Sequence, residues 1–219
     1  MKTVTKVLAV VMALVLALSI AACGKANSVV GHWDYNLSVK ALVEGVKSLN
    51  NSDMDPTELN MYTELLKAFD GVEMTIKLEL NDDNTYRFYT DAESVQLAAE
   101  QIKNNIVDVL PAAFAAVGMD EAAMNSYLES AGMTMEQLAE SFAEQMNAND
   151  LIESTDDRGT YRVEDNKLYF TANGAQEDTS KYVEFKLSAT ELELTNVEGN
   201  ALGFDEYENF IFPMIFKKV

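Results

Sequence analysis

The sequence predicts an α+β fold: an eight-stranded antiparallel up-and-down β-barrel, or a strongly curled sheet, with helical insertions gathered at one end. The clearest observation is segment 72–80, which alternates apolar and polar side chains without interruption, as a half-buried strand does. Residues 81–84 then form a polar turn, and 85–90 return as a β-rich partner strand. The other observation is the alternation of short and long connections between strands.

Loop lengths place the insertions. The second, fourth and sixth connections are tight, at 81–84, 164–166 and 188–190. The first, third, fifth and seventh are long, at 36–71, 91–157, 173–180 and 196–209. In an up-and-down meander all odd connections lie at one end, so the helical insertions should lie together there. Alternatively, 91–153 docks on the side of an open sheet.

The first strand and first insertion span 29–71. Gly31, Trp33 and Tyr35 share one face of the strand expected at 29–35. One helix follows it, and another should begin at Asp55, an N-cap followed by Pro56 and by Glu58 three positions on. Asp53 and Asp55, with Thr57 and Glu64, weakly resemble a calcium loop, but Glu58 stands where such a loop needs glycine. We therefore expect no metal site.

The second insertion, 91–157, should be largely helical. Asp91 should cap a first helix, Pro111 should start or kink another, and Asp120 and Thr134 should cap two more. Five methionines lie in this segment: Met119, Met124, Met133, Met135 and Met146. Methionine-rich helical faces can form adaptable binding surfaces. The interpretation we favour is that they fill a core, because their spacing is that of a core stripe.

Five strands complete the sheet. They are expected at 158–163, 167–172, 181–187, 191–195 and 210–219. Pro213 lacks the N–H that a ladder needs, which argues against full closure of the barrel at the last strand.

The N-terminus has the pattern of a processing signal. Lys2 and Lys6 precede an apolar run, 7–18, which is short for a membrane span, and small residues then lead to Cys23. The stretch 18–23 resembles a bacterial lipobox, which implies that Cys23 is diacylated and becomes the mature N-terminus. An ordinary signal peptide with an incidental cysteine is the alternative. We expect a signal peptide at 1–22, the lipidated cysteine and a tether at 23–28, and one domain at 29–219.

The predicted signal also implies where the protein is located. The tether after Cys23 reaches at most about 17 Å, so the domain should sit close to the membrane on its extracytoplasmic face. Gly24 after the cysteine and the lack of disulfides favour a Gram-positive surface.

The strands carry a family resemblance. Gly31-His32-Trp33 matches the G-x-W that opens the first strand of lipocalins, and the turn-strand pieces 83–86 and 159–161 look like those of bacterial lipocalin-like lipoproteins. The resemblance implies that Gly31 and Trp33 close the barrel beside a basic residue of the last strand, Lys217 or Lys218. It also implies binding of a small ligand. The large insertion at Asp91 departs from the family pattern.

Composition excludes several classes of function. The net charge of −20 should repel nucleic acid and anionic lipid. One cysteine allows no internal disulfide, and one histidine allows no histidine-rich metal site. His32 has no motif that supplies a serine or cysteine partner, and among 36 acidic residues close carboxylate pairs arise by chance. We expect neither a cofactor nor enzymatic activity.

Two functions stay open. The first is binding of a small apolar ligand in the barrel under a helical lid. Its candidate residues are the inward aromatics, which should lie toward the helix-capped end, and two methionines: Tyr35, Phe88, Tyr161, Phe212, Met124 and Met135. These aromatics could instead simply plug the barrel, which is the interpretation we favour for them, since small barrels are usually filled. The second is a cell-envelope protein–protein interaction module that uses the methionine-rich insertion.

Overall fold

A computed structural model of the chain describes residues 28–50, 54–145, 152, 155–199, 201 and 211–219. The predicted signal peptide, Cys23, most of the tether and Met146 lie outside these residues. Within the described part of the chain, no helix combines the length and the apolar character that crossing a bilayer requires.

The strands form a closed antiparallel barrel in which sequential strands are neighbours, as predicted. This architecture is compatible with a lipocalin-like ligand-binding fold. The strands are β1 (Gly31–Ser38), β2 (Glu73–Leu80), β3 (Thr85–Thr90), β4 (Asp157–Glu164), β5 (Lys167–Ala172), β6 (Tyr182–Leu187), β7 (Glu191–Glu198) and β8 (Met214–Lys218).

Closure occurs between the first and last strands. β1 pairs with β2 on one side and with β8 on the other, where Trp33 stands opposite Lys218. The last strand begins at Met214, four residues later than the sequence predicts, so Pro213 precedes the ladder. The argument from Pro213 against closure was therefore wrong, because its missing N–H falls outside the paired residues.

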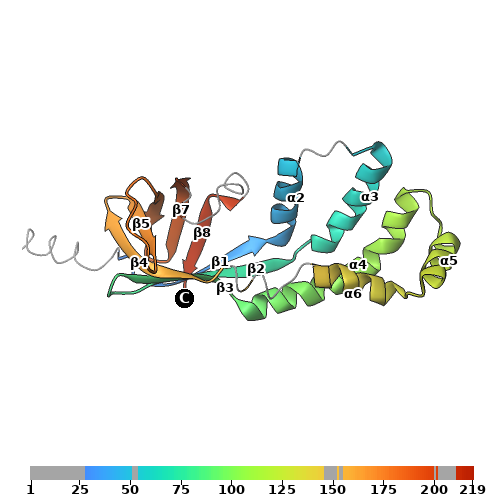
Figure 1. Cartoon of the computed structure of the whole chain (residues 1–219), viewed down its shortest axis with the longest axis horizontal. Coiled ribbons are helices and arrows are strands. Elements are labelled where there is room, and N and C mark those ends of the chain that lie inside the picture. The colour runs from blue at the N-terminus through green and yellow to red at the C-terminus, as the bar shows by residue number, and fades with distance from the viewer. Residues whose placement is uncertain (1–27, 51–53, 146–151, 153–154, 200, 202–210) are drawn as a thin grey trace, which may run out of the picture.

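The prediction that the insertions gather at one end is confirmed. The three tight turns, β2–β3, β4–β5 and β6–β7, lie at one end of the barrel. The helices extend from the opposite end along the long axis, so the molecule is elongated (Figure 1). They project beyond the barrel mouth rather than folding back over it, which leaves the expected lid without a counterpart among the described residues.

The helices begin where their caps predict. They are α2 (Val39–Asn50), α3 (Pro56–Leu66), the 3₁₀ turn η1 (Lys67–Phe69), α4 (Ala92–Ala116), α5 (Glu121–Ala131) and α6 (Met135–Gln145). Asp55 forms a capping box with Glu58, and the carboxylate of Asp120 accepts a hydrogen bond from the Ala123 amide. The longest helix, α4, runs through Pro111 without a break.

α4 is the central helix of the insertion. It contacts α3, α5 and α6 in the helical half, and β2 at the barrel rim. Two bonds fix its start: the Thr75 amide donates to Ser94 Oγ at 2.9 Å, and the Asp91 amide donates to the Thr75 carbonyl at 2.8 Å. Further along, the Asn105 side chain donates to the Ala68 carbonyl at 2.8 Å. The insertion is thus bonded to the barrel on its β2 side.

Candidate functional site

The interior of the barrel is packed. Eight inward side chains have 0% of their surface exposed, which leaves no room for water beside them: Trp33, Leu78, Leu168, Val183, Leu192, Leu194, Met214 and Phe216. Aromatic rings meet within this core, with centroids 4.8 Å apart for Tyr86 and Phe170. The middle of the barrel is filled as interiors of small barrels usually are, so the sequence-based alternative of plugging describes it.

The four candidate aromatics occupy different levels of the barrel. Tyr35 lies toward the helical end, where its ring centroid is 5.5 Å from that of Phe216 and burial raises the pKa of its phenol. Phe212 is partly buried just before β8, and Phe88 is buried midway along β3. Tyr161 was wrongly expected at the helical end: its hydroxyl donates to the Asn81 carbonyl at 2.8 Å, in a tight turn. β4 starts at the helical end, so its fifth residue already lies at the other. These aromatics therefore do not converge on one pocket.

A polar pair lies inside the barrel wall. The Tyr86 hydroxyl donates to an Asp157 carboxylate oxygen at 2.6 Å. Burial, followed by this hydrogen bond, raises the pKa of the Tyr86 phenol far above its usual range. Because the carboxylate satisfies the buried hydroxyl, the pair stabilises the packed interior and offers no reactive group. The sequence gives no signal for it.

The G-x-W residues sit where the barrel closes. Trp33 is fully buried and its Nε1 donates to the Val29 carbonyl at 2.8 Å. Lys218 Nζ lies 5.1 Å from the centre of the indole ring, and Lys217 instead pairs with Glu191. Of the two lysines that the sequence left open for this role, Lys218 is therefore the one beside the tryptophan, and Lys217 is not. Glycine is favoured at position 31 because its φ of 154° is one that residues with a Cβ rarely adopt, and a Cβ there would also lie 3.0 Å from Lys218 Cε.

His32 faces away from this core. Alternation along β1 puts it on the outer surface, where its side chain is 67% exposed and Nδ1 lies 3.8 Å from Glu79. Nothing in this arrangement prepares the imidazole for catalysis.

An apolar groove runs through the helical half, and it is the candidate functional site. Its volume is about 430 Å³. It draws residues from α3, α4, α5 and α6 and from the loop before α5: Met61, Leu65, Leu110, Ala113, Phe114, Met119, Tyr127, Leu138 and Phe142. All of these are apolar or aromatic, which is the lining that ligand sites favour. Two of them, Tyr127 and Phe142, keep 54% and 38% of their surface exposed, so the groove is open to solvent.

The methionines divide between core and groove. Met124 is 3% exposed on the inner face of α5, and Met135 is partly buried against the core, as the favoured interpretation predicts. Neither lines the groove, whereas Met61 and Met119 do. On sequence grounds we favoured a core role for the methionines of the second insertion and did not single out Met61 or Phe142. The exposure of Phe142 shows that the helices do not cover one another completely.

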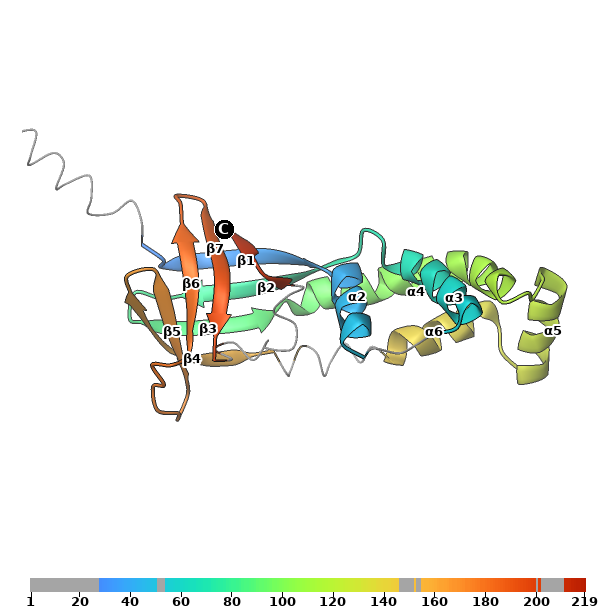
Figure 2. The ribbon, with the colours of Figure 1, turned by 90° about the horizontal axis from the view of Figure 1, so that it is seen from above.

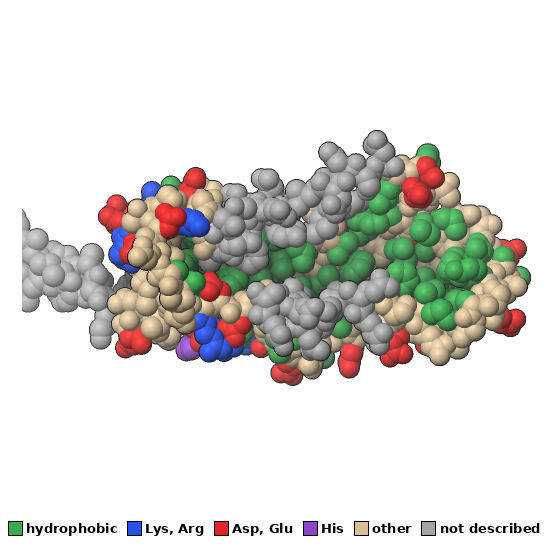
Figure 3. Space-filling model, in the orientation of Figure 1, with side chains coloured by type: hydrophobic (Ala, Val, Ile, Leu, Met, Phe, Trp, Pro, Cys, Tyr) green, Lys and Arg blue, Asp and Glu red, His purple; other side chains and the backbone are tan. Residues whose placement is uncertain are grey.

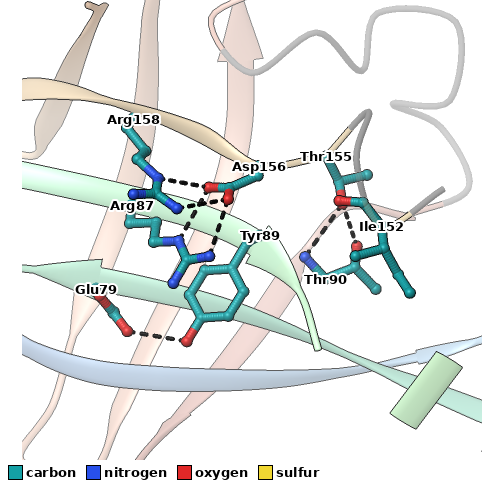
Figure 4. Close-up of polar contacts among 8 residues, drawn as sticks. All are labelled: Glu79, Arg87, Tyr89, Thr90, Ile152, Thr155, Asp156 and Arg158. Atoms are coloured by element: carbon teal, nitrogen blue, oxygen red, sulfur yellow. Dashed lines mark hydrogen bonds and ion pairs between the residues drawn. The ribbon is translucent and has the colours of Figure 1, made fainter. Parts of the chain in front are cut away.

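Both ends of the second insertion are fastened to each other at the barrel rim. The Thr90 amide at the end of β3 donates to the Thr155 hydroxyl oxygen at 3.2 Å. Next to it, the Asp156 carboxylate accepts two hydrogen bonds from each of the Arg158 and Arg87 guanidiniums, at 2.7–3.0 Å (Figure 4). We call these five residues the insertion clamp. The Arg158 and Arg87 guanidiniums hold the pKa of the Asp156 carboxyl well below its usual range.

Charge is distributed unevenly over the molecule. The strands carry eight basic and nine acidic residues, whereas residues 92–143 carry eight acidic residues and one lysine. That lysine, Lys103, is 2.8 Å from Glu140. On the face in Figure 3, hydrophobic side chains spread over the helical half with acidic ones along its border, and the basic ones lie on the barrel half. The apolar groove therefore lies in a negative field.

A second pocket lies at the other end of the barrel. It has a volume of about 510 Å³ and lies beside the first described residue, Ser28, and the turn residue Asn84. Its lining includes Arg162, whose guanidinium is already paired with Glu164 and Glu177. Because its lining is mixed in polarity and its arginine is already paired, it is a weaker candidate than the apolar groove.

Comparison with known proteins gives no functional assignment, so the proposal below rests on the geometry of the structure. No protein-family model, curated protein or solved structure matches the chain.

Proposed function

We propose that this chain is a lipid-anchored, non-enzymatic binding protein of the bacterial cell envelope that holds an apolar ligand in the groove of its helical half. The single observation that carries the proposal is the groove itself, a solvent-open apolar site of about 430 Å³ built from four helices. Its open walls distinguish it from the packed barrel, where inward side chains such as Leu168 and Phe216 have no exposed surface.

The anchor is part of the proposal. The lipobox-like stretch ending at Cys23 supports lipidation and an extracytoplasmic address, with a Gram-positive surface favoured. The resemblance to bacterial lipocalin-like lipoproteins rests on Gly31-His32-Trp33 and on the strand order. A Cys23→Ser variant should lose incorporation of labelled palmitate and stay unprocessed. Retention of the label would contradict lipidation at Cys23 but would not bear on ligand binding in the groove.

In this proposal the barrel lies between the membrane anchor and the groove. Ser28 lies beside the tight turn that contains Asn84, so the anchored end of the barrel faces the membrane. The helical half extends from the opposite end (Figure 2). In this arrangement the groove is held away from the anchoring bilayer, and the insertion clamp fixes its position relative to the barrel.

Photolabelling tests the binding site. The full chain in neutral-lipid nanodiscs is irradiated with a small uncharged alkyl diazirine, and labelled peptides are mapped by mass spectrometry. Labelling should concentrate on α3–α6 peptides and fall in Phe142→Ser. The matched control is Leu97→Ser, which removes an even more exposed apolar side chain, 59% accessible on α4 and outside the groove. Equal labelling of both variants would remove the groove as the site.

A further inference from the structure

The structure assigns a class of ligand to the groove: we infer that its occupant is a basic amphipathic helix of a partner protein. The inference rests on the proposed function and adds to it the shape and the charge of what binds. Three observations carry it: the openness of the groove, the charge around it and its position at the end of the molecule opposite Ser28, the first described residue.

Openness favours a helix over a small molecule. Sites for small molecules enclose most of the ligand surface, commonly about 70–90%. Here Tyr127 and Phe142 form walls that are themselves 54% and 38% exposed. A bound helix needs only its apolar stripe covered, because its polar face stays in water. The groove offers that one-sided cover, and its linings Met61 and Met119 are the unbranched, adaptable side chains that accommodate such a stripe.

Charge selects a basic helix. Residues 92–143 contain eight acidic residues and a single basic one, Lys103. Lys103 already forms an ion pair with Glu140, at 2.8 Å. Acidic side chains stand two positions from a groove residue on each helix of this stretch, for example Asp108 on α4, Glu129 on α5 and Glu136 on α6. Such a field attracts lysine and arginine on the polar face of the occupant and repels an acidic one. At physiological salt the attraction acts over about 8 Å, so only carboxylates close to the groove contribute to it.

Position argues against a bilayer as the occupant. The described chain begins at the tight-turn end, beside Asn84, and the groove lies at the opposite end of an elongated molecule. Anionic lipid would also be repelled by the same carboxylates. A protein segment meets both conditions, since it can approach the far end freely and carry positive charge.

Peptide binding tests the inference on the full chain in neutral-lipid nanodiscs. Three dye-labelled 16-residue peptides are compared by fluorescence anisotropy, with empty nanodiscs subtracted: an amphipathic Leu/Lys helix, a Leu/Glu helix of the same pattern, and a shuffled Leu/Lys sequence. The Leu/Lys helix should bind at least about tenfold more tightly than either other peptide and weaken as salt rises. Phe142→Ser should weaken it about tenfold, and Leu97→Ser should leave it unchanged.

A charge variant separates this inference from the proposed function. Glu121→Gln with Glu129→Gln removes two exposed carboxylates of α5 and should weaken the basic helix several-fold, without changing photolabelling by the uncharged diazirine. Equal binding of the basic and acidic helices would overturn the inference, as would binding of anionic vesicles in place of the peptide. Groove photolabelling without binding of any peptide would overturn it but preserve the proposed function. Absence of both signals would overturn both.

Discussion

The hydroxyl oxygen of Thr155 lies 2.8 Å from that of Thr90, where the chain returns from the second insertion to the barrel. Sixty-five positions separate the two residues, and all of α4, α5 and α6 lie between them. The contact makes the two ends of the insertion meet at one point of the rim. Three of the four helices that line the groove are therefore carried by a closed loop rather than by two independent chain ends.

Thr155→Val should destabilise the protein by about 1–2 kcal/mol. The substitution keeps the shape of the side chain but removes the oxygen that accepts the Thr90 amide, and Thr90 is only 5% exposed. Urea unfolding measures the change. Thr160→Val, on the solvent face of β4, is the control and should change stability by less than about 0.5 kcal/mol. Equal effects of the two variants would mean that the clamp contributes nothing.

Asp156 should make the free energy of unfolding depend on pH in the acidic range. Its pKa is lowered in the folded state, first by the Arg158 and then by the Arg87 hydrogen bonds, from an ordinary value of 3.8. The contribution is therefore complete above that value and is lost as the pH falls below it. Asp156→Asn should lower the free energy of unfolding at pH 7 by only about 1 kcal/mol, because the ion pair is partly exposed. The variant should also lose less stability than the parent chain between pH 5 and pH 2.

Urea midpoints over this pH range give the comparison. Glu129→Gln, which removes an exposed carboxylate of α5, should leave the acid dependence nearly as it is in the parent chain. An Asp156→Asn variant with the same acid dependence as the parent would show that the clamp charges are not coupled to folding.

Gly159→Ala should be the most damaging of the glycine substitutions. A Cβ at this position of β4 would lie 1.9 Å from the carbonyl oxygen of Thr171 on β5, which is backbone and cannot move aside. We expect a loss of about 3 kcal/mol or failure to fold. Gly174→Ala meets no atom within 4 Å and, at a φ of 81°, should cost only about 1 kcal/mol. Thermal unfolding ranks the two, and the reverse order would contradict the close approach of β4 and β5.

Trp33→Phe should destabilise the barrel by about 2 kcal/mol. It removes the bond from Nε1 to the Val29 carbonyl and leaves a void at a position with no exposed surface. Because Trp33 is the only tryptophan, the parent chain itself reports on closure through low acrylamide quenching of its emission. Tyr127→Phe, at an exposed ring, is the matched control and should be near neutral. Strong quenching in the native state would contradict a closed barrel.

The barrel could be predicted because its signals are local and redundant. Alternation in 72–80 identifies a strand without any partner, and the parity of loop lengths fixes the end at which helices gather. The error at Pro213 has a physical cause: apolar residues before it resemble a strand, but pairing starts only where β7 provides partners, at Met214. Caps at Asp55, Asp120 and Thr134 were predicted because each depends on residues three positions apart.

The groove could not be predicted in the same way. Leu138 and Phe142 lie on a stripe that looks identical whether another helix covers it or not. Exposure of Phe142 depends on how α3, α4, α5 and α6 are arranged in space, and that arrangement is set by contacts between segments far apart in the chain. The prediction from the inward aromatics failed for a different reason. Alternation places Tyr35 and Tyr161 on the inner face of the barrel, but it does not show whether the space between them is filled.

Methionine methyl NMR tests the central claim most directly. Met61 and Met119 line the groove, whereas Met74 and Met214 lie in the barrel core at 3% and 0% exposure. With ¹³C-methyl methionine in the full chain, addition of the uncharged apolar diazirine in the dark should shift the Met61 and Met119 signals in the parent and in Leu97→Ser, and much less in Phe142→Ser. The Met74 and Met214 signals should stay in place. Shifts at Met74 and Met214 with none at Met61 and Met119 would put the ligand in the barrel and contradict the account.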